Sequence, residues 1–220
     1  MSLDASLMEL ADDICYSVHD LEDAIALGLV TRKNFERIME QRQCTPKFLH
    51  ELDRNLKDIF HCNTLDTITD TLNGLFSKDT CVRKAKIGRL IHLFISTCRL
   101  KENKKFSSPL LRLNAVLPDP FAALQKALGQ VVKEIVILSP SVQQLEFKGQ
   151  RIIIELFEVF STDPTRFLPE TTLHSYNNAE DDNAKMRIIC DYLAGMTDEY
   201  AAKVYERIFC PHRGSVFDRL

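Results

Sequence analysis

The sequence predicts an all-α protein of nine or ten helices, and three observations lead to this prediction. Glycine and proline are scarce, at 7 and 8 of 220 residues, which argues against a turn-rich β protein. Apolar residues recur at intervals of three and four over long segments, the spacing of one helix face. Residues that start or stop helices, such as threonine, aspartate and glycine, stand at the ends of these segments.

The overall composition is that of a folded globular protein. Hydrophobic residues make up 45% of the chain, charged residues make up 27%, and the net charge is −3. These values exclude a mostly disordered chain. They also exclude a strongly basic protein whose whole surface would attract nucleic acid.

Five helices are expected in the first hundred residues. The first covers residues 4–27, with Asp4 as its N-cap and Gly28 as its C-terminal stop. The other four are expected over residues 31–43 after Thr31, 45–60 opening on Thr45 and Pro46, 64–77 after Asn63 or Thr64, and 80–100 after Asp79 or Thr80.

A break follows these helices. Residues 107–120 contain three prolines, so we expect an extended loop or a short strand pair, and the best internal boundary of the chain. Further helices are expected over residues 121–138, 139–160, 183–194 and 197–209, the last of them capped by Thr197. Residues 164–182 are interpreted as a polar connection.

Cysteine usage and hydropathy indicate the compartment. The seven cysteines form no C-x-x-C pair, which is typical of reduced thiols in the cytoplasm. No apolar run approaches the roughly 20 residues of a membrane span. No signal peptide opens the chain. We therefore expect a cytoplasmic protein with no membrane partner.

The first expected helix has an apolar stripe and a polar line on roughly opposite sides. The line consists of Asp12, Tyr16 and Asp20, spaced i, i+4 and i+8, so its two carboxylates lie about 12 Å apart. Any surface helix shows such a polar line. This line, however, has no lysine or arginine to neutralise it, and its aromatic ring suits a sugar or base with polar groups at each end. The stripe consists of Ala11, Ile14, Val18, Leu21 and Ile25.

Several stretches resemble one enzyme family. Residues 7–24, LMELADDICYSVHDLEDA, resemble the last catalytic motif of the deoxyguanosine triphosphate triphosphohydrolases, which belong to the HD superfamily. Residues 190–201, CDYLAGMTDEYA, resemble the family's C-terminal signature. Residues 138–142 and 146–153 resemble its phosphohydrolase-associated region. The resemblance covers about residues 5–210.

This resemblance implies a function and a site. Family members cut a deoxynucleoside triphosphate into deoxynucleoside and inorganic triphosphate, with dGTP the expected substrate here. Asp12 would be one ligand of a divalent metal ion, Mn²⁺ or Mg²⁺, otherwise held by two histidines and an aspartate. Tyr16 would lie against the deoxyribose, and Asp20 would accept a hydrogen bond from its 3′-hydroxyl. The family also implies a homo-oligomer and, in some members, a response to single-stranded DNA.

The remaining metal ligands of the family, a histidine and a His-Asp pair, lie upstream of the motif. Only eleven residues precede Asp12 here, none of them histidine, and the only His-Asp pair follows it at His19 and Asp20. We therefore expect the C-terminal part of a longer enzyme, inactive and without metal when alone. Asp12 should line a half-built pocket. The alternative is a non-catalytic helical module that oligomerises or binds nucleotide or DNA.

The resemblance divides the chain into three regions. Residues 1–30 would contain the last helix of the HD catalytic domain, residues 31–106 a helical connection, and residues 107–220 the phosphohydrolase-associated helical region.

Two basic clusters are further candidates. In residues 83–89, Arg83 and Lys86 are possible contacts to a substrate phosphate or an allosteric nucleotide, although a solvated helix face is the simpler interpretation. The second cluster, followed by Phe106, could contact a single strand of nucleic acid. Its members are Arg99, Lys101, Lys104 and Lys105.

Overall fold

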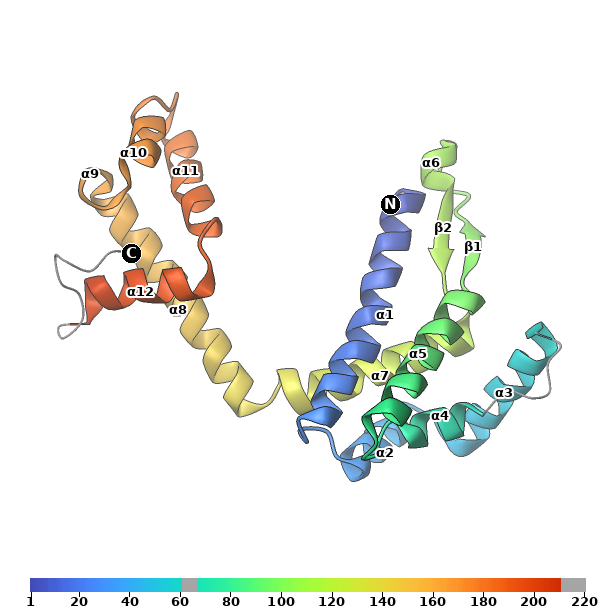
Figure 1. Cartoon of the computed structure of the whole chain (residues 1–220). Coiled ribbons are helices and arrows are strands. Elements are labelled where there is room, and N and C mark those ends of the chain that lie inside the picture. Colours follow the sequence, from blue (N-terminus) through green and yellow to red (C-terminus); the bar gives the residue numbers. More distant parts are fainter. Residues whose placement is uncertain (61–66, 211–220) are drawn as a thin grey trace. The chain divides into compact units, whose positions relative to one another are not determined.

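The computed structural model describes residues 1–60 and 67–210, and within them it confirms the all-α fold (Figure 1). The described chain contains 12 α-helices, one π-helical turn and one two-stranded antiparallel sheet. None of these helices is long and apolar enough to cross a membrane. In chain order the elements are α1 (Leu3–Ala26), α2 (Arg32–Gln41), α3 (Pro46–Phe60), α4 (Ile68–Gly74), α5 (Thr80–Thr97), β1 (Arg99–Glu102), α6 (Pro109–Arg112), β2 (Leu113–Val116), α7 (Asp119–Val132), η1 (Lys133–Ile137), α8 (Pro140–Thr162), α9 (Pro164–Phe167), α10 (Glu170–Asn177), α11 (Asp182–Ala194) and α12 (Asp198–Phe209).

Local capping residues explain several helix starts. Thr31 caps α2 in a capping box with Asn34, and Asp79 accepts a hydrogen bond from the Cys81 backbone at the start of α5. Thr197 caps α12 through the Tyr200 backbone. All three starts are confirmed.

Gly28 ends α1, as predicted. Its φ of 73° is left-handed, a conformation that glycine adopts at little cost. The backbone N–H of Gly28 donates to Ile25, and that of Leu29 donates to Ala24, which completes a Schellman motif.

Four expected boundaries differ from the structure. Ser2, not Asp4, caps α1, by accepting a hydrogen bond from the Ala5 backbone at 3.2 Å. Helix α5 stops at Thr97 because residues 99–102 pair with residues 113–116 as strands β1 and β2. Residues 164–182 are not merely a connection, since they form α9 and α10. The predicted start of the fourth helix at Asn63 or Thr64 lies outside the described residues, and α4 as described ends at Gly74, before residue 77.

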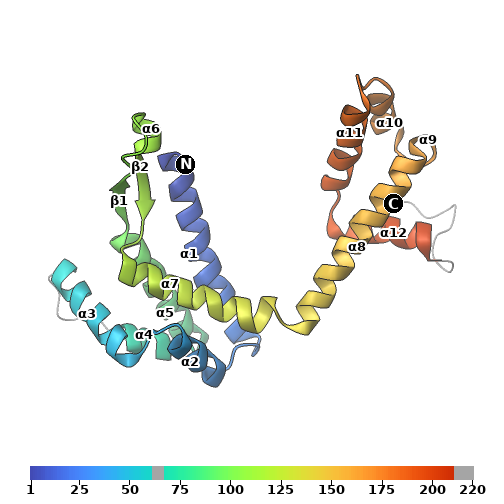
Figure 2. The same ribbon diagram turned by 180° about the vertical axis from the view of Figure 1, so that it is seen from behind.

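Helix α1 organises the first compact unit, Met1–Ser139. It contacts α7, β2 and α5, and Figures 1 and 2 both show it beside the hairpin and α7. A Cβ built on Gly129 of α7 would lie 3.5 Å from Tyr16 Cε1 and 3.6 Å from Ser17 Cβ. Helices α1 and α7 are therefore in contact at Gly129, where an added Cβ would make ordinary van der Waals contacts. The fully buried side chains around this contact include Val18, Leu21, Leu90, Phe94, Leu124 and Leu128.

The second compact unit, Pro140–Leu220, has its own apolar core. Side chains of α8, α11 and α12 meet there, with Leu156 and Ile189 fully buried. The Tyr205 hydroxyl of α12 donates to Glu155 Oε2 of α8 at 2.7 Å, and the rings of Phe160 and Tyr192 meet edge to face at 5.5 Å.

The chain divides between Ser139 and Pro140, later than the 107–120 stretch that the sequence favoured. The reason is the packing of α7, which contacts α1 and α2 and therefore belongs to the first unit. The other predicted division, with boundaries at residues 30 and 106, follows the regions of the resembled family and not the compact units of the structure. It stays a prediction.

The central place of α1 predicts a stability difference between two leucines. Leu21 is fully buried, whereas Leu27, at the helix end, is 74% exposed. We expect Leu21→Ala to lower the free energy of unfolding by about 2–5 kcal/mol because it leaves a cavity. Leu27→Ala should change it by no more than about 0.5 kcal/mol. Urea unfolding of the two variants tests this, and equal losses would contradict the core assignment.

Candidate functional site

The predicted line Asp12, Tyr16 and Asp20 lies on the exposed side of α1. Among the described residues, neither carboxylate has a hydrogen-bond or ion-pair partner. Two charged groups without partners and an aromatic ring thus follow one another along successive turns. The line is therefore geometrically available to a ligand.

The buried side of α1 is rotated slightly from the predicted stripe. Ile14, Val18 and Leu21 are buried as expected. Ala11 is exposed, and Ser17 is buried in its place against α7. The Ser17 hydroxyl donates to the Ile14 carbonyl at 3.1 Å, so this buried polar group is satisfied within its own helix.

Tyr16 connects the exposed line to the helix packing. Its ring lies against Gly129 of α7, and the side chain remains 37% exposed. Burial raises the pKa of the Tyr16 phenol above its ordinary value, and the negative charge of Asp20 raises it further. The phenol therefore stays protonated near neutral pH and can both donate and accept a hydrogen bond.

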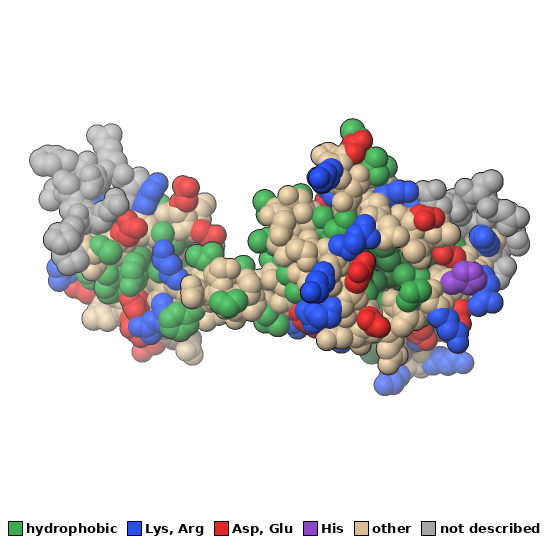
Figure 3. Space-filling view, turned by 90° about the horizontal axis from the view of Figure 1, so that it is seen from below, with side chains coloured by type: hydrophobic (Ala, Val, Ile, Leu, Met, Phe, Trp, Pro, Cys, Tyr) green, Lys and Arg blue, Asp and Glu red, His purple; other side chains and the backbone are tan. Residues whose placement is uncertain are grey.

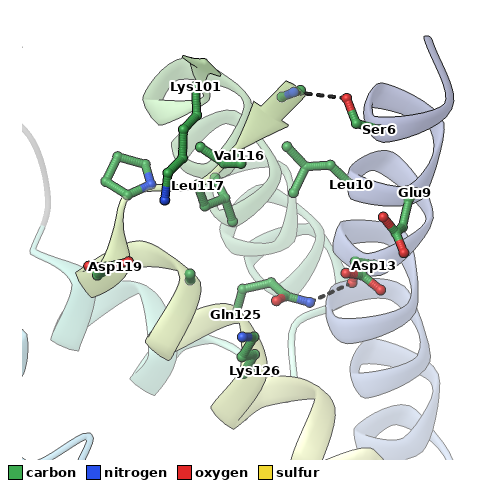
Figure 4. Close-up of a pocket in the computed structure, with 13 residues that line it drawn as sticks. Ser6, Glu9, Leu10, Asp13, Lys101, Val116, Leu117, Asp119, Gln125 and Lys126 are labelled. Carbon is green, nitrogen blue, oxygen red and sulfur yellow. Dashed lines mark hydrogen bonds between the residues drawn. The ribbon is translucent and has the colours of Figure 1, made fainter. Parts of the chain in front are cut away.

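A cavity of about 550 Å³ lies beside this line, between α1, the hairpin and α7 (Figure 4). Two carboxylates of α1 line this cavity, Glu9 and Asp13, whereas Asp12 does not line it. Asp12 is thus exposed on a neighbouring face, and its expected half-built pocket is not formed by this cavity. The remaining charged lining residues are Lys101 of β1 with Asp119 and Lys126 of α7.

Hydrogen bonds fix the walls of the cavity. The Gln125 side-chain amide of α7 donates to the Asp13 carbonyl of α1 at 2.9 Å. The Ala115 backbone N–H of β2 donates to the Ser6 hydroxyl at 2.8 Å. Figure 4 shows both bonds bridging the gap between α1 and the opposite wall. No local sequence pattern marks this cavity, because its residues come from α1, β1, β2 and α7.

Arg83 is held inside the first unit. Its Nε lies 3.9 Å from Glu22 Oε1 of α1, and these side chains are only 14% and 15% exposed. An Nη1 hydrogen bond to the Ser77 carbonyl at 3.3 Å adds to this contact, although Nε itself has no hydrogen-bond partner among the described residues. Arg83 therefore links α5 to α1 and is not part of a solvated helix face. The Lys86 side chain packs across Gly74 of α4.

The described residues do not form a metal site by themselves. No group of three or more histidine, cysteine, aspartate or glutamate side chains lies close enough together there to hold an ion. Asp12 supplies a single carboxylate, whereas a protein-bound divalent ion takes several oxygen or nitrogen ligands.

The Arg83 contact predicts a second stability difference. Arg83→Gln leaves Glu22 poorly compensated in a mostly buried position, so we expect a loss of about 1–3 kcal/mol in the free energy of unfolding. Its neighbour Lys84 is exposed, and Lys84→Gln is expected to be neutral in the same urea experiment. A neutral Arg83→Gln variant would show that the contact adds nothing to stability.

The surroundings of Tyr16 predict a change in titration. Asp20→Asn removes the negative charge that disfavours the phenolate, so the pKa of Tyr16 should fall towards 10.0 while burial keeps it above that value. Carbon-13 NMR of labelled tyrosine across a pH series measures this, with Tyr16→Phe assigning the signal. Asp4→Asn is the control, because twelve residues of helix separate it from Tyr16 by more than a Debye length of about 10 Å. An unchanged titration in Asp20→Asn would contradict the coupling.

Comparison with known proteins identifies relatives of the chain. The phosphohydrolase-associated domain family matches residues 115–207, a stretch that crosses the division between the two units. Proteins named deoxyguanosinetriphosphate triphosphohydrolase-like match nearly the whole chain. The relative from Shewanella woodyi is 41% identical over 218 residues, which are 99% of this chain and 46% of that protein.

Other relatives with the same name agree. The protein of Shewanella sediminis is 40% identical over 218 residues, covering 99% of this chain and 46% of the relative. The protein of Histophilus somni is 41% identical over 208 residues, which are 94% of this chain and 43% of that protein. The chain is thus similar over nearly its whole length to deoxyguanosinetriphosphate triphosphohydrolase-like proteins, and it spans about half the length of these relatives.

Proposed function

We propose that this chain is the C-terminal region of a metal-dependent deoxynucleoside triphosphate triphosphohydrolase, with dGTP the first substrate to test. The observation that carries the proposal is the 41% identity to a protein of that name across 99% of the chain. The exposed line on α1 gives the proposal specific residues, because Asp12, Tyr16 and Asp20 are the positions that the family resemblance assigns to metal and sugar.

The geometry of α1 supports this division of roles. Asp12 and Asp20 are two turns apart with the Tyr16 ring between them, so a sugar lying on the ring would have a carboxylate at each end. A neutral phenol beside it offers both a hydrogen-bond donor and an acceptor. In the proposed enzyme the Asp20 carboxylate accepts a hydrogen bond from the 3′-hydroxyl of the sugar.

The proposed metal needs ligands beyond those described. Asp12 would contribute one oxygen ligand to Mn²⁺ or Mg²⁺, and a histidine and a His-Asp pair from the longer protein would supply the others. When bound, such an ion polarises a phosphate and activates water. On this proposal the 220-residue chain alone binds no catalytic ion and does not hydrolyse nucleotide.

The test compares the longer gene product with the 220-residue chain. Release of triphosphate and deoxynucleoside is measured for each of the four dNTPs with Mn²⁺ and with Mg²⁺. We expect the longer protein to be active and the 220-residue chain to be inactive. In the longer protein, Asp12→Ala should lower kcat/KM about a hundredfold or more, since losing even a residue that supports a metal ligand costs about 10- to 100-fold.

A matched control separates the role of Asp12 from a general charge effect. Asp4 is another exposed carboxylate of α1, about two turns before Asp12, and Asp4→Ala should leave kcat/KM within about twofold. Activity of the 220-residue chain, or full activity of Asp12→Ala, would overturn the assignment. An inactive longer protein would favour the alternative, a non-catalytic helical module.

Exposed apolar side chains favour an assembly for either function. Phe147, Ile153 and Ile154 of α8 are exposed in the second unit, and Met8 is exposed on α1. Figure 3 shows apolar side chains at the surface among charged ones. Such patches are typical of protein contacts, so a cytoplasmic homo-oligomer is part of the proposal, and a single-stranded DNA effector remains a further candidate partner.

A further inference from the structure

An open hollow of about 630 Å³ lies against the β-hairpin of the first unit, a volume within the range of small-ligand sites. Strand β1, the loop after it and strand β2 line it. The side chains that matter are Lys101, Lys104 and Lys105, with the amides of Asn103 and Asn114. Three ammonium groups and two amides therefore border one space.

The charge of this hollow is local and positive. Residues 99–112 contain five cationic side chains and one carboxylate, although the whole chain has a net charge of −3. That carboxylate, Glu102, is neutralised by Arg112, whose Nε lies 3.2 Å from Glu102 Oε1. Among the described residues, the three lysine ammonium groups have no ion-pair partner. They are therefore available to an external anion.

Backbone and side-chain hydrogen bonds hold the loop that carries these lysines. The Asn103 backbone N–H donates to the Arg112 carbonyl at 2.6 Å, and the Lys105 backbone N–H donates to Asn103 Oδ1 at 3.2 Å. Lys101 lies opposite Asn114 in the strand register, and the Asn114 amide donates to the Met1 carbonyl at 3.2 Å. The cationic groups thus extend from a fixed scaffold, which reduces the entropy cost of binding.

We propose that this hollow binds an oligophosphate, that is, two or more linked phosphates borne by a free polyphosphate or nucleotide or by a single strand of nucleic acid. Spaced ammonium groups suit a chain of phosphates better than one small anion. Phe106, which is 39% exposed, follows the lysines directly and could stack on a base. Binding at this site does not depend on the proposed hydrolase activity.

The neighbouring cavity helps to define the ligand. Lys101 borders both spaces, and Figure 4 shows its side chain reaching towards the α7 side of the larger cavity. That cavity carries the carboxylates Glu9, Asp13 and Asp119, which would repel phosphate. Of these two cavities, Lys104 and Lys105 border only the hairpin hollow. They are therefore the principal contacts of the proposed site.

The test uses isothermal titration calorimetry of the 220-residue chain at low ionic strength. The probes are inorganic tripolyphosphate and a short oligothymidylate, titrated separately and then in competition. We expect the double variant Lys104→Gln, Lys105→Gln to weaken binding about tenfold or more. Lys104→Arg with Lys105→Arg should retain binding, because the charges remain. The slope of log K against log salt for the oligothymidylate should be about −2 for three contacts.

A charge-matched control distinguishes a local site from general attraction. Lys33 and Lys47 are exposed lysines elsewhere on the first unit, and their double replacement by glutamine changes the net charge equally. The proposal is supported if either probe binds and only the Lys104 and Lys105 variant weakens that binding. The probe that binds then identifies the source of the phosphates. If neither probe binds, or if the control weakens binding as much, the proposal is wrong.

Discussion

The close contact between α1 and α7 determines where the rest of the first unit lies. Gly129 of α7 lies against Tyr16 and Ser17 of α1, and the apolar side chains on either side of this contact are fully buried. Since one side of α1 is buried against α7, β2 and α5, the side that bears Asp12 and Asp20 must face outwards. The polar line is therefore a consequence of core packing: a rotation of α1 that buried Ala11 would move these carboxylates as well.

The same helix anchors the hairpin. The Ser6 hydroxyl of its first turns accepts a hydrogen bond from Ala115, and the Met1 carbonyl accepts one from Asn114. A two-stranded hairpin alone is marginally stable in water, so these bonds and the contact with α1 give it support that its own strands lack. The positions of the lysines on β1 and the following loop thus depend on α1 too. Arg83, paired with Glu22, adds a polar link from α5 to the C-terminal part of this organising helix.

Local chemistry made much of this predictable. The ends of α1, α2, α5 and α12 follow from Gly28, Thr31, Asp79 and Thr197, whose effects act within one helical turn. The hairpin register, the cavity beside α1 and the contact of Arg83 with Glu22 join residues far apart in sequence, so no periodic pattern marks them. Helix α10 was missed because its polar sequence shows little amphipathic pattern, although it packs Leu173 and Tyr176 against the core of the second unit. The spacing of Asp12, Tyr16 and Asp20 predicts the polar line. Its position outside the cavity depends on the tertiary packing around α1, which places Asp13 but not Asp12 in the cavity wall.

The two proposed sites are related through the direction of α1. The hairpin contacts its first turns, at Met1 and Ser6, so the lysine cluster lies towards the Asp12 end of the polar line and away from Asp20. On the proposed function the phosphates of a substrate also lie towards Asp12, while the sugar extends towards Asp20. Positive potential from the hairpin would then favour this orientation over the reverse, because Coulomb attraction weakens with distance and salt. An oligophosphate held at the hairpin would reduce that potential, which gives the two sites a physical means of coupling without a change in fold.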